Sequence, residues 1–298
     1  MKILILSRDA NYYSTKRLVQ EARKLRHKAV VIDPLECEIS VGATFNAKRS
    51  TLNAPRSVSD LTSFDVVIPR IGIVGVDYAL LVAHQLEFMG KPMLNSARAL
   101  TYTKNKFLAL QILCKSGIPV PETMMIRNPS RIKAAIKKLG GLPVVLKLFR
   151  GSQGKGVMLA ENLSSVESIL TAVWAIGFDV ILQEYLKETK GEDIRLLVLG
   201  NEVIGAMRRR PAKNDFRSNV HQGGRMKKVT LTAEEKQMAL EATRALGLKL
   251  AGIDIMRTRK GPMVLEANGS PGFEGLEKLT RLNIAQRIVE YACRQAEF

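Results

Sequence analysis

Two short apolar segments near the end of the sequence constrain the fold, because each of them carries one carboxylate. Residues 250–257 (LAGIDIMR) and 262–267 (PMVLEA) are typical of two strands joined as a hairpin, with a loop centred near Lys260. In that register Asp254 lies directly opposite Glu266. Like charges that face each other across paired strands destabilise a sheet, so this pairing needs a physical explanation.

A divalent cation shared by the two strands would remove the conflict, since hard oxygen atoms are the ligands that magnesium takes. Side chains two residues apart on a strand point to the same face, so Asn268 adds a third oxygen beside Glu266. A solvated acidic face, or a register displaced by one residue, would explain the same pattern without a metal. The third oxygen favours the metal site.

The first ninety residues alternate between strand and helix patterns. Residues 2–6 (KILIL), 29–33 (AVVID) and 65–70 (DVVIPR) are apolar enough for buried strands, and helical patterns occupy 14–28 and 78–89. This order favours a parallel sheet covered by helices. No GxGxxG sequence follows the first strand, so a dinucleotide-binding fingerprint is not expected.

From Asn95 onward the pattern changes to hairpins flanked by helices, which is typical of an α+β region. We expect helices or strands at 106–115, 142–150, 156–161, 164–177, 179–186, 193–200, 202–210, 232–246, 250–257 and 262–267, followed by a final helix. Ser164 or Ser165 is expected to cap one helix, and Thr232 with Glu235 has the spacing of a capping box.

Composition limits the class of protein and of partner. The chain has 298 residues, 46% of them hydrophobic and 25% charged, which suits two or three small globular domains. Its formal charge of +18 indicates an anionic partner such as nucleic acid, a ribonucleoprotein surface, nucleotide phosphates or an acidic substrate. No apolar run approaches the roughly 20 residues of a membrane helix, so no membrane partner is expected.

The cysteines and the first residues indicate a cytoplasmic protein. The three cysteines are scattered and form no CxxC pair, so neither a zinc site nor a disulfide framework is expected. A reducing cytosol is the simplest location for such a chain. The apolar run that opens the sequence is shorter than the roughly 7–15 residues of an export signal.

Three further patterns are compatible with phosphate or nucleotide binding. The glycine-rich stretch 151–156 (GSQGKG) joins two strands, and its backbone amides could approach phosphates, although a flexible hairpin loop is the more common explanation of such a stretch. Lys147 lies in an apolar strand, where it needs an anion unless it faces the open side of the sheet. The strand end at 183–185 (QEY) could offer hydrogen bonds to a flat base, or simply run into a polar loop.

Residues 207–228 hold eight basic residues against one acidic residue, Asp215. A solvated basic loop or a nucleic-acid patch would explain such a run. Stacking platforms for nucleic acid normally use several aromatic side chains, and Phe216 is the only one here. Arg208 and Arg210 alternate on one strand face, so they are candidates for bidentate pairing with an acidic substrate.

Taken in order, these segments resemble the ATP-grasp ligases and, among them, the RimK family, which adds glutamate to the C-terminus of a ribosomal protein. The resemblance covers nearly the whole chain and rests on Lys106, Lys147, GSQGKG, QEYL, GEDIR, DFRSN, AGIDIMR and VLEANGSPGFEG. ILSRD, PRIG and DFRSNVHQGG point to RimK within the superfamily. The resemblance implies an ATP-grasp fold with a Rossmann-like pre-ATP-grasp domain (1–96), a central subdomain (97–182) and a C-terminal subdomain (183–298).

The resemblance also implies roles for individual residues. Asp254, Glu266 and Asn268 correspond to ligands of magnesium or manganese, typically two ions, held against the phosphates of ATP. The implied ATP-binding residues are Lys106, Lys147, Gly151, Ser152, Gln153, Gly154, Gln183, Glu184, Tyr185, Asp193, Arg217, Ser218 and Asn219. Arg217, with Arg208 and Arg210, is expected to take part in catalysis.

The implied reaction joins glutamate to the acidic C-terminus of a small-subunit ribosomal protein, or to a growing glutamate tail, through an acyl phosphate. ADP and phosphate are released. Association with the ribosome and assembly into a homo-oligomer are further expectations. A sister ligase that adds an amino acid to a deazaflavin, a methanopterin or a carrier protein would share the ATP site. A basic RNA-binding protein explains the charge but not the three converging oxygen ligands.

Overall fold

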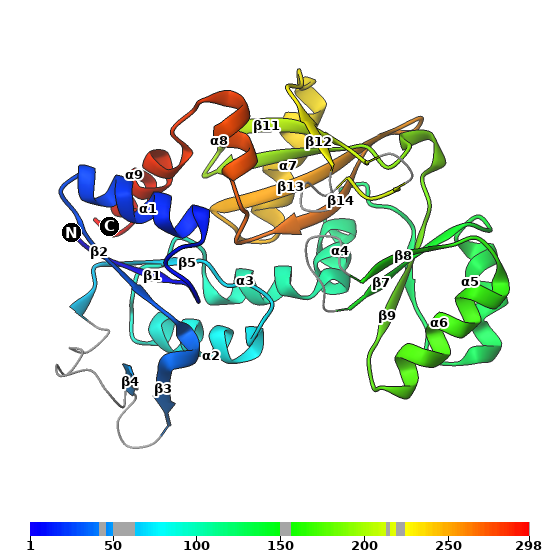
Figure 1. Cartoon of the computed structure of the whole chain (residues 1–298), viewed down its shortest axis with the longest axis horizontal. Coiled ribbons are helices and arrows are strands. Elements are labelled where there is room, and N and C mark those ends of the chain that lie inside the picture. The colour runs from blue at the N-terminus through cyan, green and yellow to red at the C-terminus, as the bar shows by residue number, and fades with distance from the viewer. Residues whose placement is uncertain (42–45, 50–62, 150–155, 213–214, 219–223, 298) are drawn as a thin grey trace.

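The computed structural model of the protein describes residues 1–41, 46–49, 63–149, 156–212, 215–218 and 224–297. Its elements gather around three main sheets, which Figure 1 shows as an N-terminal group at left, a group from the middle of the chain at right, and a C-terminal group above and between them. The parallel α/β part and the antiparallel α+β parts confirm the predicted fold class.

The N-terminal sheet is parallel, as the alternation of strand and helix patterns predicted, with the order β2-β1-β5. Its elements are β1 (Lys2–Leu6), α1 (Tyr13–Lys24), β2 (Lys28–Ile32), β5 (Val66–Pro69) and α2 (Val76–Phe88), with η1 (Pro34–Glu36) and the hairpin β3 (Cys37–Ser40) and β4 (Asn46–Arg49). Successive side chains of β1 point to opposite faces, so Ile3 packs with α1 whereas Leu4 packs with α2.

The middle of the chain forms a four-stranded antiparallel sheet with the order β6-β9-β7-β8. Its elements are β6 (Thr123–Met125), η3 (Pro129–Arg131), α5 (Ile132–Lys138), β7 (Val144–Leu148), β8 (Val157–Ala160), α6 (Leu163–Ala175) and β9 (Val180–Glu184). The predicted cap of α6 at Ser164 or Ser165 is wrong. Asn162 is the cap, because its side-chain oxygen accepts from the backbone N–H of Ser165 at 2.8 Å and the helix begins at Leu163.

The C-terminal sheet has five strands in the order β12-β11-β10-β13-β14. Its elements are η4 (Lys187–Thr189), β10 (Asp193–Leu199), β11 (Glu202–Arg210), β12 (Arg225–Lys227), α7 (Ala233–Ala245), β13 (Leu250–Thr258) and β14 (Gly261–Asn268). Thr232 and Glu235 form the predicted capping box of α7. One face of the sheet packs against α7 and against α4 (Lys106–Lys115), with Ala99 of α3 (Ala97–Lys104) beside them.

The hairpin of β13 and β14 has the predicted register where the carboxylates lie. Asp254 pairs with Glu266 and Gly252 pairs with Asn268. The turn itself is shorter than expected, since Thr258 pairs with Gly261, and a bulge between Asp254 and Ile255 shifts the pairing by one residue. The bulge therefore places the two carboxylates opposite each other.

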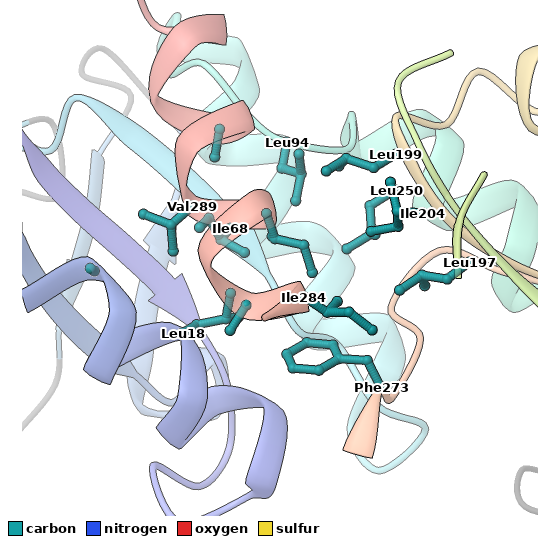
Figure 2. Packing of buried hydrophobic residues seen from close by; sticks show 14 of the residues in the cluster. Leu18, Ile68, Leu94, Leu197, Leu199, Ile204, Leu250, Phe273, Ile284 and Val289 are labelled. Carbon is teal, nitrogen blue, oxygen red and sulfur yellow. The ribbon is translucent and has the colours of Figure 1, made fainter. Parts of the chain in front are cut away.

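A continuous apolar core joins the N-terminal sheet to the opposite face of the C-terminal sheet. Figure 2 shows α9 (Ile284–Gln295) lying between them, with Ile284 and Val289 between residues of the two sheets such as Ile68 and Leu197. Phe273, which precedes α8 (Glu274–Thr280), is fully buried in this core. The core fixes the N-terminal sheet relative to β10, β11 and β13.

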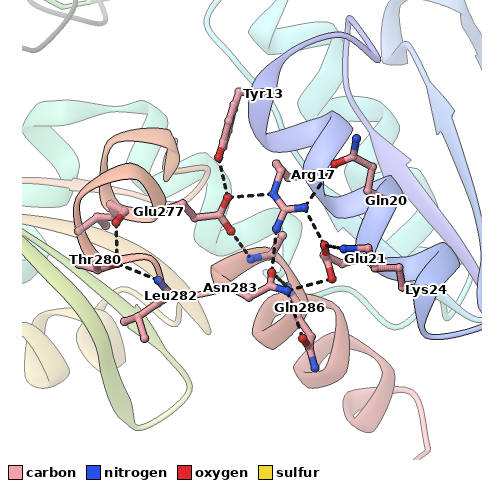
Figure 3. Close-up of polar contacts among 12 residues, drawn as sticks. Tyr13, Arg17, Gln20, Glu21, Lys24, Glu277, Thr280, Leu282, Asn283 and Gln286 are labelled. Carbon is pink, nitrogen blue, oxygen red and sulfur yellow. Dashed lines mark hydrogen bonds and ion pairs between the residues drawn. The ribbon is translucent and has the colours of Figure 1, made fainter.

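A polar network reinforces the same contact at its edge (Figure 3). Glu277 of α8 accepts from the Tyr13 hydroxyl at 2.8 Å and from Arg17 Nε at 3.0 Å, so the acidic side chain joins α8 to α1. Arg17 continues to Glu21 at 2.7 Å and to Asn283, which precedes α9. Three elements from the two ends of the chain are thus held together.

The proposed domain boundaries at 96 and 182 stay predictions. Two packing facts bear on them: α4 packs against the C-terminal sheet, and β9, a strand of the four-stranded sheet, runs to Glu184. Among the described residues, no helix is long and apolar enough to cross a membrane.

Candidate active site

A cavity of about 870 Å³, including the part open to solvent, lies between the four-stranded and the five-stranded sheet. One wall comes from β7, β8 and β9, and the other from β10, β11, β13 and β14. Many residues singled out from the sequence line it: Lys106, Lys147, Gln183, Glu184, Tyr185, Asp193, Arg217, Ser218, Asp254 and Glu266. The fold therefore gathers these distant positions at one place.

Lys147 faces this cavity from β7, opposite the acidic residues of the other sheet. Burial lowers the pKa of Lys147 to about 8, and the nearby charge of Lys106 acts in the same direction. A lysine held in this way is stabilised as an ammonium when an anion binds beside it. The alternative that Lys147 lies on an open sheet face does not hold, since its side chain lines the cavity.

Lys106 reaches the cavity from the first residue of α4, whose N-terminus is capped by the side chain of Asn105. Its Nζ lies 2.9 Å from Glu266 Oε1. Burial alone would raise the pKa of Glu266, but the charge of Lys106 outweighs it and the pKa is lowered. Glu266 is therefore a carboxylate that already faces a cation.

The face of the five-stranded sheet that lines the cavity carries alternating acids and arginines. Arg209 lies opposite Asp193, and its Nε and Nη2 donate to that carboxylate at 2.6 and 2.8 Å. Arg195 lies opposite Asp254 and donates to both of its oxygens, with Nη2 at 2.7 Å from Oδ2. Arg209 Nη2 also lies 2.8 Å from Asp254 Oδ2, so the pairs form one ladder.

The ladder sets the charge state of its carboxylates. Burial would raise the pKa of Asp254, but the guanidinium groups of Arg195 and Arg209 hold it at about 2. Burial dominates for Asp193 and raises its pKa, against the lowering effect of Arg209. The Ser218 hydroxyl donates to Asp193 as well, which ties the 215–218 segment to the site.

The sequence reasoning missed Arg195 and Arg209. Arg209 is only 5% exposed and lines the cavity. Arg208 and Arg210 share a strand face, as expected, but that face points away from the cavity lining, and both pair with Glu192. The available signal was the strand alternation itself, which places Arg209 on the opposite face from its two neighbours.

The other predicted site residues make contacts of their own, and one of them, Asn268, does not line the first cavity. Gln183 is buried on β9 and donates to Thr123 Oγ1 at 2.8 Å, and Arg217 pairs with Asp215. Glu184 Oε1 accepts from the backbone N–H of Glu122 at 2.8 Å. Asn268 lines a second, adjoining cavity rather than the first. Gly151, Ser152, Gln153, Gly154 and Asn219 lie outside the described residues.

The three residues predicted to be metal ligands, Asp254, Glu266 and Asn268, offer oxygen atoms of the kind that a hard divalent cation takes. Asp254 and Glu266 are a cross-strand pair, and Asn268 follows two residues later on the same face of β14. Carboxylate oxygens have further lone pairs beyond those the arginines use, so Asp254 can still coordinate. The described residues contain no group of three His, Cys, Asp or Glu placed for a metal.

Comparisons with known proteins agree over the whole chain. The RimK pre-ATP-grasp domain matches residues 1–100 and the RimK-like ATP-grasp domain matches residues 103–292. A protein of Pseudoalteromonas atlantica named "Probable alpha-L-glutamate ligase 2" is 41% identical over 297 residues, covering 100% of this chain and 97% of that protein.

Two solved structures share the fold. The RimK domain ATP-grasp protein of Sphaerobacter thermophilus has a TM-score of 0.73 at 21% identity, covering 98% of this chain and 99% of that one. The macrocyclase MdnC of Microcystis aeruginosa, solved with its precursor peptide MdnA, has a TM-score of 0.74 at 17% identity, covering 99% and 100%. At these identities the likeness shows the fold alone, which is the ATP-grasp fold with a pre-ATP-grasp N-terminal domain.

Proposed function

The chain belongs to the RimK-like ATP-grasp family and is a ligase that forms carbon–nitrogen bonds, and from that premise we propose that it is an ATP-dependent α-L-glutamate ligase. Its acceptor is the acidic C-terminus of a small-subunit ribosomal protein or a glutamate tail growing on it. The observation that carries the proposal is the cavity in which Lys106 and Lys147 face the Asp193–Arg209–Asp254–Arg195 ladder.

The cavity offers apolar side chains for the base of ATP and cationic side chains for its phosphates. Apolar side chains from both sheets, among them Leu148, Val157 and Met256, can hold a flat base between them. Lys147 and Lys106 offer cations to the phosphates. Binding a triphosphate beside Lys147 would restore the ammonium form that burial disfavours.

The reaction has two steps. A carboxylate oxygen of the acceptor bonds to the γ-phosphorus of ATP as the bond to the bridging oxygen breaks, which releases ADP. The amine nitrogen of glutamate then attacks the acyl carbon, phosphate leaves with its oxygen, and the amine loses a proton. Two anions must meet in the first step, so the lysines of the cavity offset their repulsion.

Asp254, Glu266 and Asn268 would hold magnesium or manganese, which would neutralise charge on the phosphates. The role of Arg195 and Arg209 is to hold the carboxylate of Asp254 ionised and in place, since its pKa is about 2 beside them. The number of ions, with two expected from the family, stays a proposal.

The charge of +18 supports attraction of acidic substrates and of a ribosomal particle. Such attraction weakens with salt, so association should slow as the ionic strength rises. Cytoplasmic location and homo-oligomer assembly stay predictions from the sequence.

Purified protein with ATP, magnesium, glutamate and an acceptor peptide ending in glutamate should release ADP and lengthen the peptide, as seen by mass spectrometry. Glutamyl-bearing cofactors and carrier proteins serve as alternative acceptors in the same assay. Asp254→Asn and Glu266→Gln should each abolish turnover without unfolding the protein, whereas Glu241→Gln on the exposed side of α7 should not. Absence of glutamate-dependent turnover with every acceptor would reject the proposal.

A further inference from the structure

A second cavity, of about 900 Å³ including its open part, adjoins the first and contains none of the ladder arginines. Val76, Asp77 and Leu80 of α2 contribute to one side of its lining, and Glu266, Ala267 and Asn268 of β14 to another. Lys106 and Glu266 line both cavities. A molecule in the second cavity would therefore lie beside the predicted metal ligands.

Lys104 brings a cation into this second cavity from the last residue of α3. Its Nζ donates to the backbone oxygen of Ile71 at 2.5 Å, and within the described ranges it forms no ion pair with a carboxylate. Burial, together with the charge of Arg70, lowers the pKa of Lys104 to about 8, although the charge of Glu266 acts in the opposite direction. Two cations therefore lie near each other, and within the described residues neither forms an ion pair, although Asp77 and Glu266 line the same cavity as Lys104.

Arg70 follows directly after β5, at the carboxyl end of a parallel strand, where ligands commonly bind in such sheets. Its Nη2 donates to the backbone oxygen of Pro271 at 2.7 Å, and its guanidinium carbon lies 5.9 Å from the centre of the Phe273 ring. Its Nη1 is buried and has no hydrogen-bond partner in the part of the chain that the structure describes. The hydroxyl oxygen of Ser270 is likewise buried and has no hydrogen-bond partner among the described residues.

Buried cations and polar atoms normally have partners, because leaving them without one costs free energy. Lys104 could serve only to bind the Ile71 carbonyl and the negative end of α3. That role does not account for Arg70, whose Nη1 lacks a partner, or for the position of Lys104 in a cavity that Asn268 and Glu266 also line. A bound anion would account for both cations.

We propose that Lys104, which lines the second cavity, and the nearby Arg70 form a carboxylate-binding subsite at the edge of this cavity, which holds a non-reacting carboxylate of a substrate while the reacting group lies beside Glu266 and Asn268. The proposal rests on the ligase function, because that reaction brings such carboxylates to this place. Free glutamate carries two, and an acidic acceptor carries them on its side chains. A guanidinium and an ammonium together match the charge and the two oxygens of a carboxylate.

Three variants test the subsite. Lys104→Met removes its cation, Lys104→Arg keeps a positive charge at the same place, and Arg70→Lys keeps charge but loses the fork of donors. Lys115→Met is the matched control, since Lys115 is likewise the last residue of a helix, α4, but is exposed. The readouts are kcat and the separate KM values for glutamate, acceptor peptide and ATP, together with thermal unfolding.

The expected result is a rise in KM of about 10- to 100-fold for one acidic substrate in Lys104→Met, with the KM for ATP and the unfolding midpoint unchanged. Lys104→Arg should recover much of the loss, Arg70→Lys should show a smaller rise, and Lys115→Met none. A rise for glutamate alone assigns the subsite to the free amino acid, and a rise for the peptide alone assigns it to the acceptor. Unchanged KM values for both acidic substrates would overturn the proposal.

A failure of the ligase function is recognised separately, because the wild-type protein would then show no glutamate-dependent turnover. In that event the subsite is tested by binding alone. Glutarate, a dicarboxylate, should raise the unfolding midpoint of the wild type and of Lys115→Met but not of Lys104→Met, and the uncharged diamide of glutarate should raise none. An equal glutarate shift in all three proteins would reject the subsite.

Discussion

Replacing Arg209 by methionine removes the cation that joins two buried carboxylates. Its Nε and Nη2 lie 2.6 and 2.8 Å from the oxygens of Asp193, and Nη2 lies 2.8 Å from Asp254 Oδ2. The neighbouring Arg210 points to the other face, where its Nε lies 2.5 Å from Glu192 and its side chain is 39% exposed. Arg210→Met is therefore a matched control on the same strand.

The expected cost differs between the two variants because only one pair is buried. Removing one partner of a buried pair costs about 3–5 kcal/mol, since it leaves a charge without compensation. Asp254 keeps Arg195 at 2.7 Å, so Asp193 bears most of the loss and we expect about 3 kcal/mol for Arg209→Met. Loss of the exposed Arg210 pair should cost about 0–1 kcal/mol.

The pH dependence gives a second signature of the same cause. Burial already raises the pKa of Asp193, and loss of Arg209 raises it further. A carboxyl whose pKa is raised in the folded state takes up its proton more readily there, so the variant gains stability as the pH falls. The deficit of Arg209→Met relative to the wild type should therefore shrink at acidic pH.

Thermal unfolding followed by circular dichroism measures both effects, with turnover as a parallel readout. The midpoint of Arg209→Met should fall by on the order of 10 °C at neutral pH, and that of Arg210→Met by a few degrees at most. Equal decreases of the unfolding midpoint in the two variants would refute the reasoning. They would show that burial of an ion pair does not decide how much the pair stabilises the protein. A deficit of Arg209→Met that grows as the pH falls would refute it as well.

Three further predictions concern single positions. Burial lowers the pKa of Lys147 to about 8, so the side chain loses its charge as the pH rises through that value. The KM for ATP should therefore rise above about pH 8. Lys147→Arg, which stays charged, should remove this pH dependence of the KM. A Cβ on Gly252 would lie 2.8 Å from Pro271 Cβ, so Gly252→Ala should displace the loop after β14 and reduce kcat, whereas Gly205→Ala, whose nearest contact would be 3.7 Å away, should not. The side chain of Asn95 makes four hydrogen bonds of 2.7–3.0 Å to backbone groups on either side of the β13–β14 hairpin, so Asn95→Ala should lower the free energy of unfolding in urea by about 2–4 kcal/mol.

Local sequence signals predicted the individual elements well. The capping box of Thr232 and Glu235, the helix at Lys106–Lys115 and the hairpin around Gly200 and Asn201 were all found where the sequence placed them. These features depend on residues only a few positions apart, so the chain itself carries the information. The cap of α6 was misplaced because Asn162 and the two serines are all good capping residues.

A bulge decides the strand register in two hairpins, of which the sequence analysis predicted only the register of β13 and β14. A regular hairpin around Gly200 and Asn201 would set Arg208 opposite Asp193, but a bulge shifts the pairing by one residue and brings Arg209 there. In the second hairpin a bulge beside Asp254 offsets a shorter turn and leaves Glu266 opposite it, as expected.

The sequence by itself indicated the main strands and helices of the three sheets and placed Asp254 opposite Glu266. It left open whether Lys147 meets an anion or faces the open side of its sheet. Only the tertiary structure decided that Arg195 and Arg209 compensate Asp254, that Lys106 compensates Glu266, and that Arg70 lies near Lys104, which lines the second cavity. The physical reason is that alternation along a strand is local, whereas bulges and the packing of one sheet against another depend on contacts between residues far apart in the chain.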